Sequence, residues 1–222
     1  MRDPESINIE FTANKETLLV TMTKGPTVET FRITEDSLNN LFMNKYSTGY
    51  MQASQDGVIY LEERDGQKVV VIQRGLRKEQ PIKWDDHVTP ITVPLTTPWT
   101  FMLFKLAPSG VGYTRQVEHL YVSSGPSLGA LTPLYSAEFL GNVWQIGRRR
   151  DTNVCWGNTM VAPGGVVTIP SLVNIAGDFY NQQFTNHIER TLTRWSDFTE
   201  TGRIPTESLG DLSSAIKKIW EA

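Results

Sequence analysis

Alternating apolar residues in the first part of the chain constrain its fold more than any other feature. Within residues 7–33, short apolar runs alternate with turn residues such as Asn14 and Pro26, and the first run, 7–11, has an apolar side chain at every second position. A period of two sends successive side chains to opposite faces of a β-strand, whereas an α-helix repeats after about 3.6 residues. We therefore predict an antiparallel β-meander over these residues.

β-Structure is expected again further along the chain. The pair Asp65 and Gly66 stands between the alternating apolar segments 58–61 and 69–73. An Asp-Gly pair supplies the two left-handed residues that a tight hairpin turn requires. These residues therefore predict a β-hairpin.

The middle of the chain is punctuated by prolines. Four of them exclude a long helix from this region: Pro81, Pro90, Pro94 and Pro98. They favour an extended stretch over residues 91–98, and the dense apolar run 99–104 predicts a buried strand. Residues 107–165 are rich in Gly, Pro and Ser, with only short apolar islands. We expect an irregular segment there, of the kind that often carries function.

Helical periodicity occurs mostly near the end of the chain. Thr34 suits an N-cap ahead of one apolar face, formed by Leu38, Leu41, Phe42 and Tyr46. Ser171 suits an N-cap ahead of a second face, formed by Leu172, Ile175 and Phe179. A third face comprises Ile188, Leu192 and Trp195, and a final one comprises Leu209, Leu212, Ile216, Ile219 and Trp220.

The order of these elements predicts the fold class. Strands come first, an irregular region follows and helices come last, which favours an α+β fold over alternating βαβ units. A length of 222 residues fits a single domain. Within it we expect a β-rich part over 1–90, a core over 91–195 and a C-terminal helix within 196–222.

Charge and cysteine content argue against several classes of protein. The chain has 21 basic and 24 acidic residues and a net charge of −3, so we expect no nucleic-acid partner. Its one cysteine cannot form an internal disulfide and favours a reducing compartment, so we expect a cytoplasmic protein. We predict neither a signal peptide nor a membrane-spanning segment. The 3 histidines lack metal-ligand spacing, so we expect no metal and no cofactor.

The residues around Cys155 resemble the active-site stretch of ubiquitin-conjugating enzymes. In that family a meander is followed by a Pro-rich segment, a His-Pro-Asn-Val element, a glycine, and an apolar residue directly before the catalytic cysteine. The matching residues of this chain are the Pro-rich segment 94–98, the pair Asn142 and Val143, Gly147, and Val154 with Cys155. The resemblance implies a ubiquitin-conjugating-enzyme-like fold.

A prokaryotic branch of that superfamily, which includes PRTRC system protein B, is more similar still. Its members show a Pro-Leu-Tyr type element, an Asn-Val pair, a Val-Cys-x-Gly-Asn core and a downstream aromatic segment that ends in Phe-Thr. In this chain those elements are residues 133–135, 142–143, 154–158 and 179–185. The resemblance covers residues 90–187.

This resemblance implies that Cys155 carries a ubiquitin-like modifier as a thioester. Its partners would be a ThiF-like activating enzyme, a small ubiquitin-like protein and a JAB-type metalloprotease. The chemistry needs a thiolate, which nearby cations favour. The candidates to supply that positive charge are Arg148, Arg149 and Arg150.

The same chemistry needs two further groups, an amide that stabilises the oxyanion and an acceptor for the proton of the incoming amine. An amide hydrogen-bond donor would stabilise the negative oxygen that forms during thioester transfer. The candidate amides are Asn142, Asn153 and Asn158, of which Asn142 is favoured by the resemblance. Aminolysis also needs a proton acceptor. The carboxylate closest in sequence to the cysteine is Asp151, and more distant candidates are His119 and His187.

A second hypothesis keeps the fold without the chemistry. A lone cysteine flanked by Val154 and Trp156 is also typical of a buried small hydrophobe. Leu140 and Gly141 stand where the eukaryotic enzymes have His-Pro. These features favour a non-catalytic adaptor or structural subunit of a mobile genetic element or phage virion. A Cys155 sulfur open to solvent favours the enzyme, and one sealed under Trp156 favours the adaptor.

Overall fold

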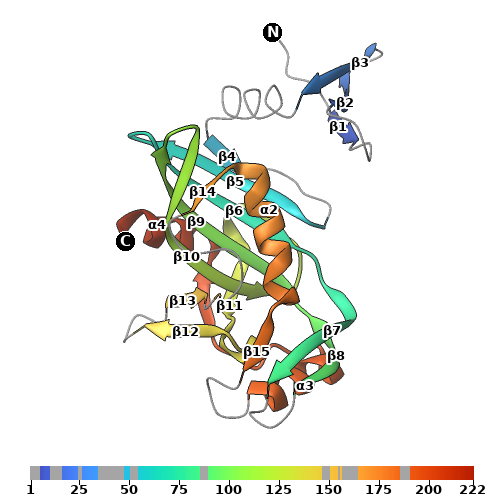
Figure 1. Cartoon of the computed structure of the whole chain (residues 1–222), viewed down its shortest axis with the longest axis vertical. Helices are drawn as coiled ribbons and strands as arrows, with labels where there is room; N and C mark the ends of the chain where they lie inside the picture. The colour runs from blue at the N-terminus through green and yellow to red at the C-terminus, as the bar shows by residue number, and fades with distance from the viewer. Residues whose placement is uncertain are drawn as a thin grey trace. The chain divides into compact units, whose positions relative to one another are not determined.

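In a computed structural model, the chain divides into two compact units (Figure 1). The units comprise residues 1–47 and 48–222. The structure describes residues 6–10, 17–24, 27–34, 48–50, 55–85, 90–146, 151–154, 156, 165–185 and 191–222. The expected single domain over the whole chain, with divisions at positions 90 and 195, stays a prediction.

The first unit is a three-stranded antiparallel sheet in the order β1-β2-β3. Its strands are β1 (Ser6–Glu10), β2 (Thr17–Lys24) and β3 (Thr27–Thr34). Thr21 lies opposite Thr30, and their hydroxyl oxygens are 3.3 Å apart. The predicted meander is therefore confirmed. The helix predicted after β3 lies outside the described residues.

The second unit is built around an antiparallel main sheet in the order β16-β11-β10-β9-β6-β5-β4. Its strands are β4 (Thr48–Tyr50), β5 (Gly57–Arg64), β6 (Gln67–Arg74), β9 (Trp99–Ser109), β10 (Gly112–Ser123), β11 (Pro133–Ser136) and β16 (Ser208–Asp211), and the short β14 (Val166–Val167) also pairs with β10. Asp65 and Gly66 have φ angles of 51° and 77°. Both angles are left-handed, as a two-residue hairpin turn needs. The predicted β5–β6 hairpin is confirmed.

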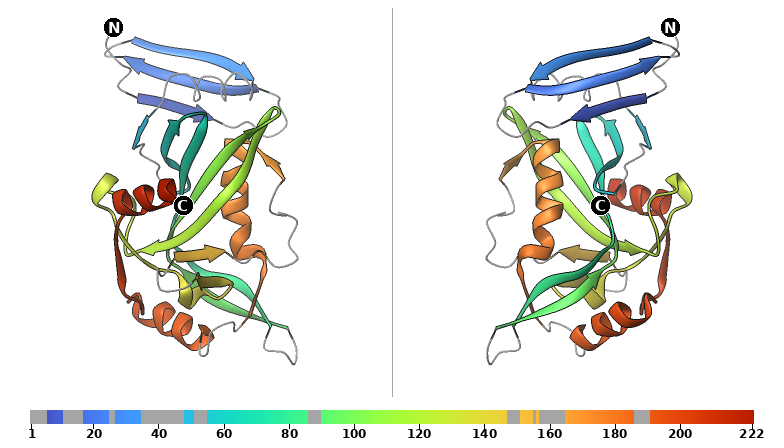
Figure 2. Two further views of the ribbon diagram at one scale, coloured as in Figure 1. Left: turned by 90° about the vertical axis from the view of Figure 1, so that its left-hand side faces the viewer. Right: turned by 90° about the vertical axis from the view of Figure 1, so that its right-hand side faces the viewer.

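The two faces of the main sheet carry separate cores, and Figure 2 shows the orange helix α2 (Ile169–Asp178) and the dark red helix α4 (Leu212–Glu221) on opposite sides of this sheet. Val70 and Ile72 of β6 join the core that includes α2, on a face here called the α2 face. Val69 and Val71 point the other way, into the core that includes α4, on the α4 face. Strict alternation along β6 thus buries both sides of the sheet, one under each helix.

A second, three-stranded sheet in the order β15-β7-β8 extends from the main one. It comprises β7 (Arg77–Asp85), β8 (Ile91–Thr97) and β15 (Gln183–Thr185), of which β15 runs parallel to β7. The helix α3 (Thr191–Thr201) packs against β8. Trp84, Phe184 and Trp195 contact one another edge-on or stacked at their junction. The predicted extended stretch 91–98 is confirmed by β8.

Short elements complete the second unit. They are the 3-10 helices η1 (Gly129–Leu131), η2 (Glu138–Leu140) and η4 (Phe179–Asn181), and the hairpin strands β12 (Val143–Ile146) and β13 (Asp151–Val154). The class is α+β with mostly antiparallel strands, as predicted. No helix within the described part of the chain has the length and apolarity required to span a bilayer.

Two helix boundaries predicted from sequence are wrong. Thr168, not Ser171, is the N-cap of α2. Their side chains form a reciprocal capping box, in which Thr168 accepts from the Ser171 amide and Ser171 accepts from the Thr168 amide. The last helix begins at Leu212 after the N-cap Asp211, and Leu209 lies in β16 instead.

The expectation of an irregular segment over 107–165 is also wrong. The strand β10 runs through twelve residues of it and pairs with β9 along its whole length. Its pairing shifts by one residue between Arg115 and Val117, which marks a β-bulge at Gln116. The bulge interrupts the alternation of side chains, so a strict period of two cannot be seen in the sequence.

Candidate functional site

The β12–β13 hairpin pairs the valine of the Asn-Val motif with the valine that precedes the cysteine. Val143 pairs with Val154 at the open end of this hairpin. Asn142 directly precedes Val143, and Cys155 directly follows Val154 in the chain. Cys155 itself lies outside the described residues. The structure therefore joins the two motifs through their adjoining residues.

Asn142 connects the hairpin to the aromatic segment further downstream. Its backbone is left-handed, with a φ of 51°, and the residue is only 4% exposed. Its side-chain Nδ2 donates a 2.7 Å hydrogen bond to the backbone oxygen of Gln183 in β15. Asparagine tolerates this backbone region better than most residues do. Asn142 is thus a buried link between two segments that lie far apart in sequence.

The remaining residues predicted for the site are placed as follows. Asp151 begins β13 and pairs with Ile146, so it lies at the opposite end of the hairpin from Val154, about 10 Å along the strand. Asn153 pairs with Trp144 in the same hairpin. The others lie outside the described residues: Cys155, Arg148, Arg149, Arg150, Asn158 and His187.

His119 lies on the other side of the sheet from Trp156, the residue that follows the cysteine. In β10, Glu118 pairs with Phe104 of the α2-face core, and His119 pairs with Leu103 of the α4-face core. Trp156 belongs to the α2-face core. Alternation therefore directs Glu118, and not His119, towards the cysteine-bearing segment.

Trp156, Glu118 and Arg115 form a compact polar cluster, here called the Trp156 triad. The Trp156 indole Nε1 donates a 2.7 Å hydrogen bond to Glu118 Oε2. Arg115 Nη1 lies 2.8 Å from Glu118 Oε1, and its guanidinium carbon lies 5.8 Å from the centre of the Trp156 ring. On another side, Trp156 makes an edge-on contact with Phe179, with ring centres 6.1 Å apart.

The β-bulge in β10 explains how both charged residues of this triad reach Trp156. Residues three apart on a regular strand point to opposite faces. Here the extra residue between them lets Arg115 pair with Leu106 and Glu118 pair with Phe104, which both belong to the α2-face core. The bulge thus places an ion pair on one buried face.

Burial controls the electrostatics of the triad. The side chains of Arg115 and Glu118 are 1% and 14% exposed. Burial raises the pKa of Glu118 above its ordinary value, although the positive charge of Arg115 and the hydrogen bond from Trp156 act to lower it. A carboxyl group whose pKa is raised by burial is a common feature of functional sites.

Sequence reasoning missed Arg115 and Glu118. The sequence shows two opposite charges, three residues apart, within residues 107–165. Because irregular structure was expected there, nothing indicated that the two side chains share a buried face. Tyr113 and Arg115 lie on the α2 face before the bulge, and Leu120 and Val122 lie on it afterwards. The residues that face α2 therefore change from odd to even positions at the bulge. A search for a constant period of two finds neither the whole strand nor the face that Arg115 and Glu118 share.

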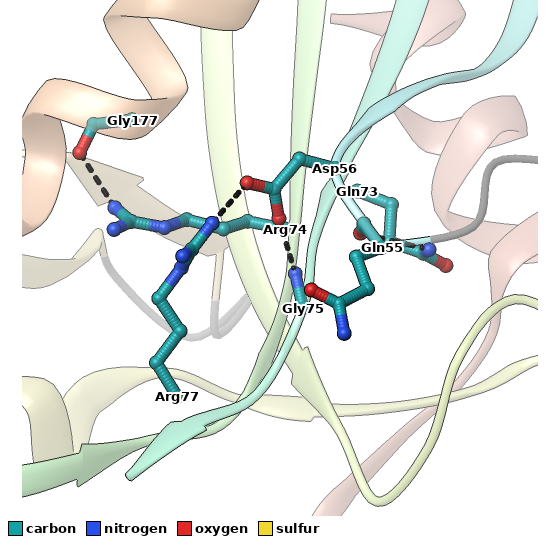
Figure 3. Close-up of polar contacts among 7 residues, drawn as sticks. All are labelled: Gln55, Asp56, Gln73, Arg74, Gly75, Arg77 and Gly177. Carbon is teal, nitrogen blue, oxygen red and sulfur yellow. Dashed lines mark hydrogen bonds and ion pairs between the residues drawn. The ribbon is translucent and has the colours of Figure 1, made fainter. Parts of the chain in front are cut away.

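A second polar cluster fixes the end of α2 onto β6 (Figure 3). Arg74 Nη1 donates a 2.5 Å hydrogen bond to the oxygen of Gly177, and its guanidinium lies 4.6 Å from the ring centre of Tyr180. Asp56 accepts hydrogen bonds from the Gly75 amide, at 2.9 Å, and from Arg77. Burial lowers the pKa of Arg74.

This arginine cluster borders a pocket of about 570 Å³. Its charges are balanced, because Arg77 binds Asp56 and Arg74 binds a carbonyl at the negative end of the α2 dipole. A larger pocket of about 710 Å³ lies beside α3, where Arg194 contacts Glu138 and the Pro205 oxygen. In both places the contacts serve packing between elements.

The described residues include no group of three or more His, Cys, Asp or Glu side chains that could hold a metal ion. Comparison of the chain with protein-family models, with curated proteins and with solved structures finds no match.

Proposed function

We propose that this chain is a ubiquitin-conjugating-enzyme-like protein that carries a ubiquitin-like modifier as a thioester on Cys155. One observation carries the proposal: motifs that the resemblance names separately meet in space. Val143 pairs with Val154, and Trp156 packs on Phe179. Asn142 binds the backbone of Gln183. The cysteine core thus adjoins both the Asn-Val pair and the aromatic segment.

The proposed reaction is a transfer between thioesters. The Cys155 thiolate attacks the carbonyl carbon of the modifier, which arrives as a thioester of its activating enzyme. A new sulfur–carbon bond forms, the old one breaks, and the activating enzyme leaves as a thiolate. The run of Arg148, Arg149 and Arg150 favours the attacking thiolate, and an asparagine amide stabilises the oxyanion.

The partners proposed with this function follow from the resemblance. They are a ThiF-like activating enzyme, a small ubiquitin-like protein, and a JAB-type metalloprotease that would remove the modifier. The proposed place of action is the cytoplasm of a bacterial or phage-infected cell.

The test is a reconstitution with a ThiF-like activating enzyme, ATP and a candidate ubiquitin-like modifier. We expect an adduct that a reducing agent cleaves and that Cys155→Ser abolishes, measured by non-reducing gel electrophoresis and intact mass. Lys217→Gln in α4, where the Lys217 side chain is 80% exposed, is a control that should keep the adduct. Absence of an adduct with every candidate modifier would refute the proposal.

A second candidate is favoured by the burial of the flanking residues. Asn142 and Trp156 are 4% and 7% exposed, and Leu140, which occupies a His-Pro position, is fully buried. Side chains used in this way suit a non-catalytic adaptor or a structural subunit of a mobile genetic element or virion. Native protein whose Cys155 resists iodoacetamide, and which forms no adduct, would favour this candidate.

A further inference from the structure

We draw no further inference here: the strongest candidate, the pocket of about 570 Å³ that Arg74 and Arg77 border at the end of α2, carries none, because Arg77 already binds Asp56, Arg74 already binds the Gly177 oxygen, and nothing in the described part of the chain indicates a ligand for it.

Discussion

Trp156 on the α2 face and Trp220 on the α4 face each contact one glutamate and one arginine, so each face carries a triad of the same three residue types. Each indole donates a 2.7 Å hydrogen bond to a glutamate. Each glutamate also binds an arginine, at 2.8 Å for Arg115 and 2.7 Å for Arg64. Each guanidinium lies over its indole ring, at 5.8 Å and 4.8 Å from the ring centre.

The two triads differ in how much water reaches their arginines, whereas the side chains of Glu62 and Glu118 are 11% and 14% exposed. The Arg64 side chain is 55% exposed, whereas that of Arg115 is 1% exposed. Burial acts to raise the pKa of both carboxyl groups. At Glu118 it prevails, and the pKa is raised. At Glu62, hydrogen bonds from Tyr60, Arg64 and Trp220 outweigh burial, and the pKa is lowered. The sign is therefore decided by the balance between burial and hydrogen bonds, to which Tyr60 contributes only at Glu62.

The largest expected difference concerns the arginines. Arg115→Met leaves Glu118 buried without a cation, so we expect the free energy of unfolding to fall by about 3 to 5 kcal/mol. Arg64 is 55% exposed, and without it Glu62 keeps its hydrogen bonds from Tyr60 and Trp220. We therefore expect Arg64→Met to lower the free energy of unfolding by only about 0.5 kcal/mol. Urea unfolding monitored by circular dichroism measures both. Equal losses in the two variants would mean that burial does not distinguish the triads.

Removal of the indole hydrogen bonds should give a smaller contrast. Trp156→Phe leaves a buried carboxylate without its donor, at a cost of about 2 kcal/mol in the free energy of unfolding. Trp220→Phe should cost about 1 kcal/mol, because Glu62 keeps its bonds from Tyr60 and Arg64. Thermal and urea unfolding of the two variants provide the comparison. A larger cost at Trp220 would contradict the expected order.

The triads should respond to pH with opposite signs. A carboxyl group whose folded pKa is raised loses its contribution to stability as the pH rises through that pKa. The stability of wild type relative to Glu118→Gln should therefore fall as the pH rises above 4.5. The stability of wild type relative to Glu62→Gln should fall as the pH drops below 4.5, because the folded pKa of Glu62 is lowered. Urea unfolding from pH 3 to pH 7 gives both slopes, and slopes of the same sign would refute the assignment.

Salt should produce the smallest effect. At 1 M NaCl the Debye length is about 3 Å, so an exposed ion pair is largely screened. We expect the cost of Arg64→Met, about 0.5 kcal/mol at low salt, to disappear at this concentration. The cost of Arg115→Met should persist, because the buried pair is shielded from salt. A parallel loss of both costs in salt titrations would show that water reaches the Trp156 triad.

Local signals in the sequence were sufficient for much of the fold. Asp65 and Gly66 predicted the β5–β6 hairpin because an Asp-Gly pair readily adopts the left-handed angles of a tight turn, and the structure shows φ angles of 51° and 77° there. The meander 7–33 and the extended segment 91–98 were predicted from period and proline content, and the structure confirms both. These features depend on residues close together in the chain, so no knowledge of the tertiary structure was required.

The candidate site was predicted less completely. The resemblance identified the residues around Cys155 as a candidate site. In the structure, Asn142 directly precedes the β12–β13 hairpin, and Cys155 directly follows it in the chain. The roles proposed for Cys155, Asn158 and the run 148–150 stay predictions. Neither Arg115 nor Glu118 was identified, because their importance depends on the bulge in β10.

The sequence by itself determined where short strands and turns form and that the chain has a single thiol. Those properties follow from side-chain periodicity and composition. Only the tertiary structure decided that Glu118 faces Trp156 while His119 faces the other core. One inserted residue reverses the alternation of a strand, and long-range pairing with β9 is what sets its place. The same long-range packing sets the burial and the hydrogen bonds of each glutamate, and therefore which of the two has a raised pKa.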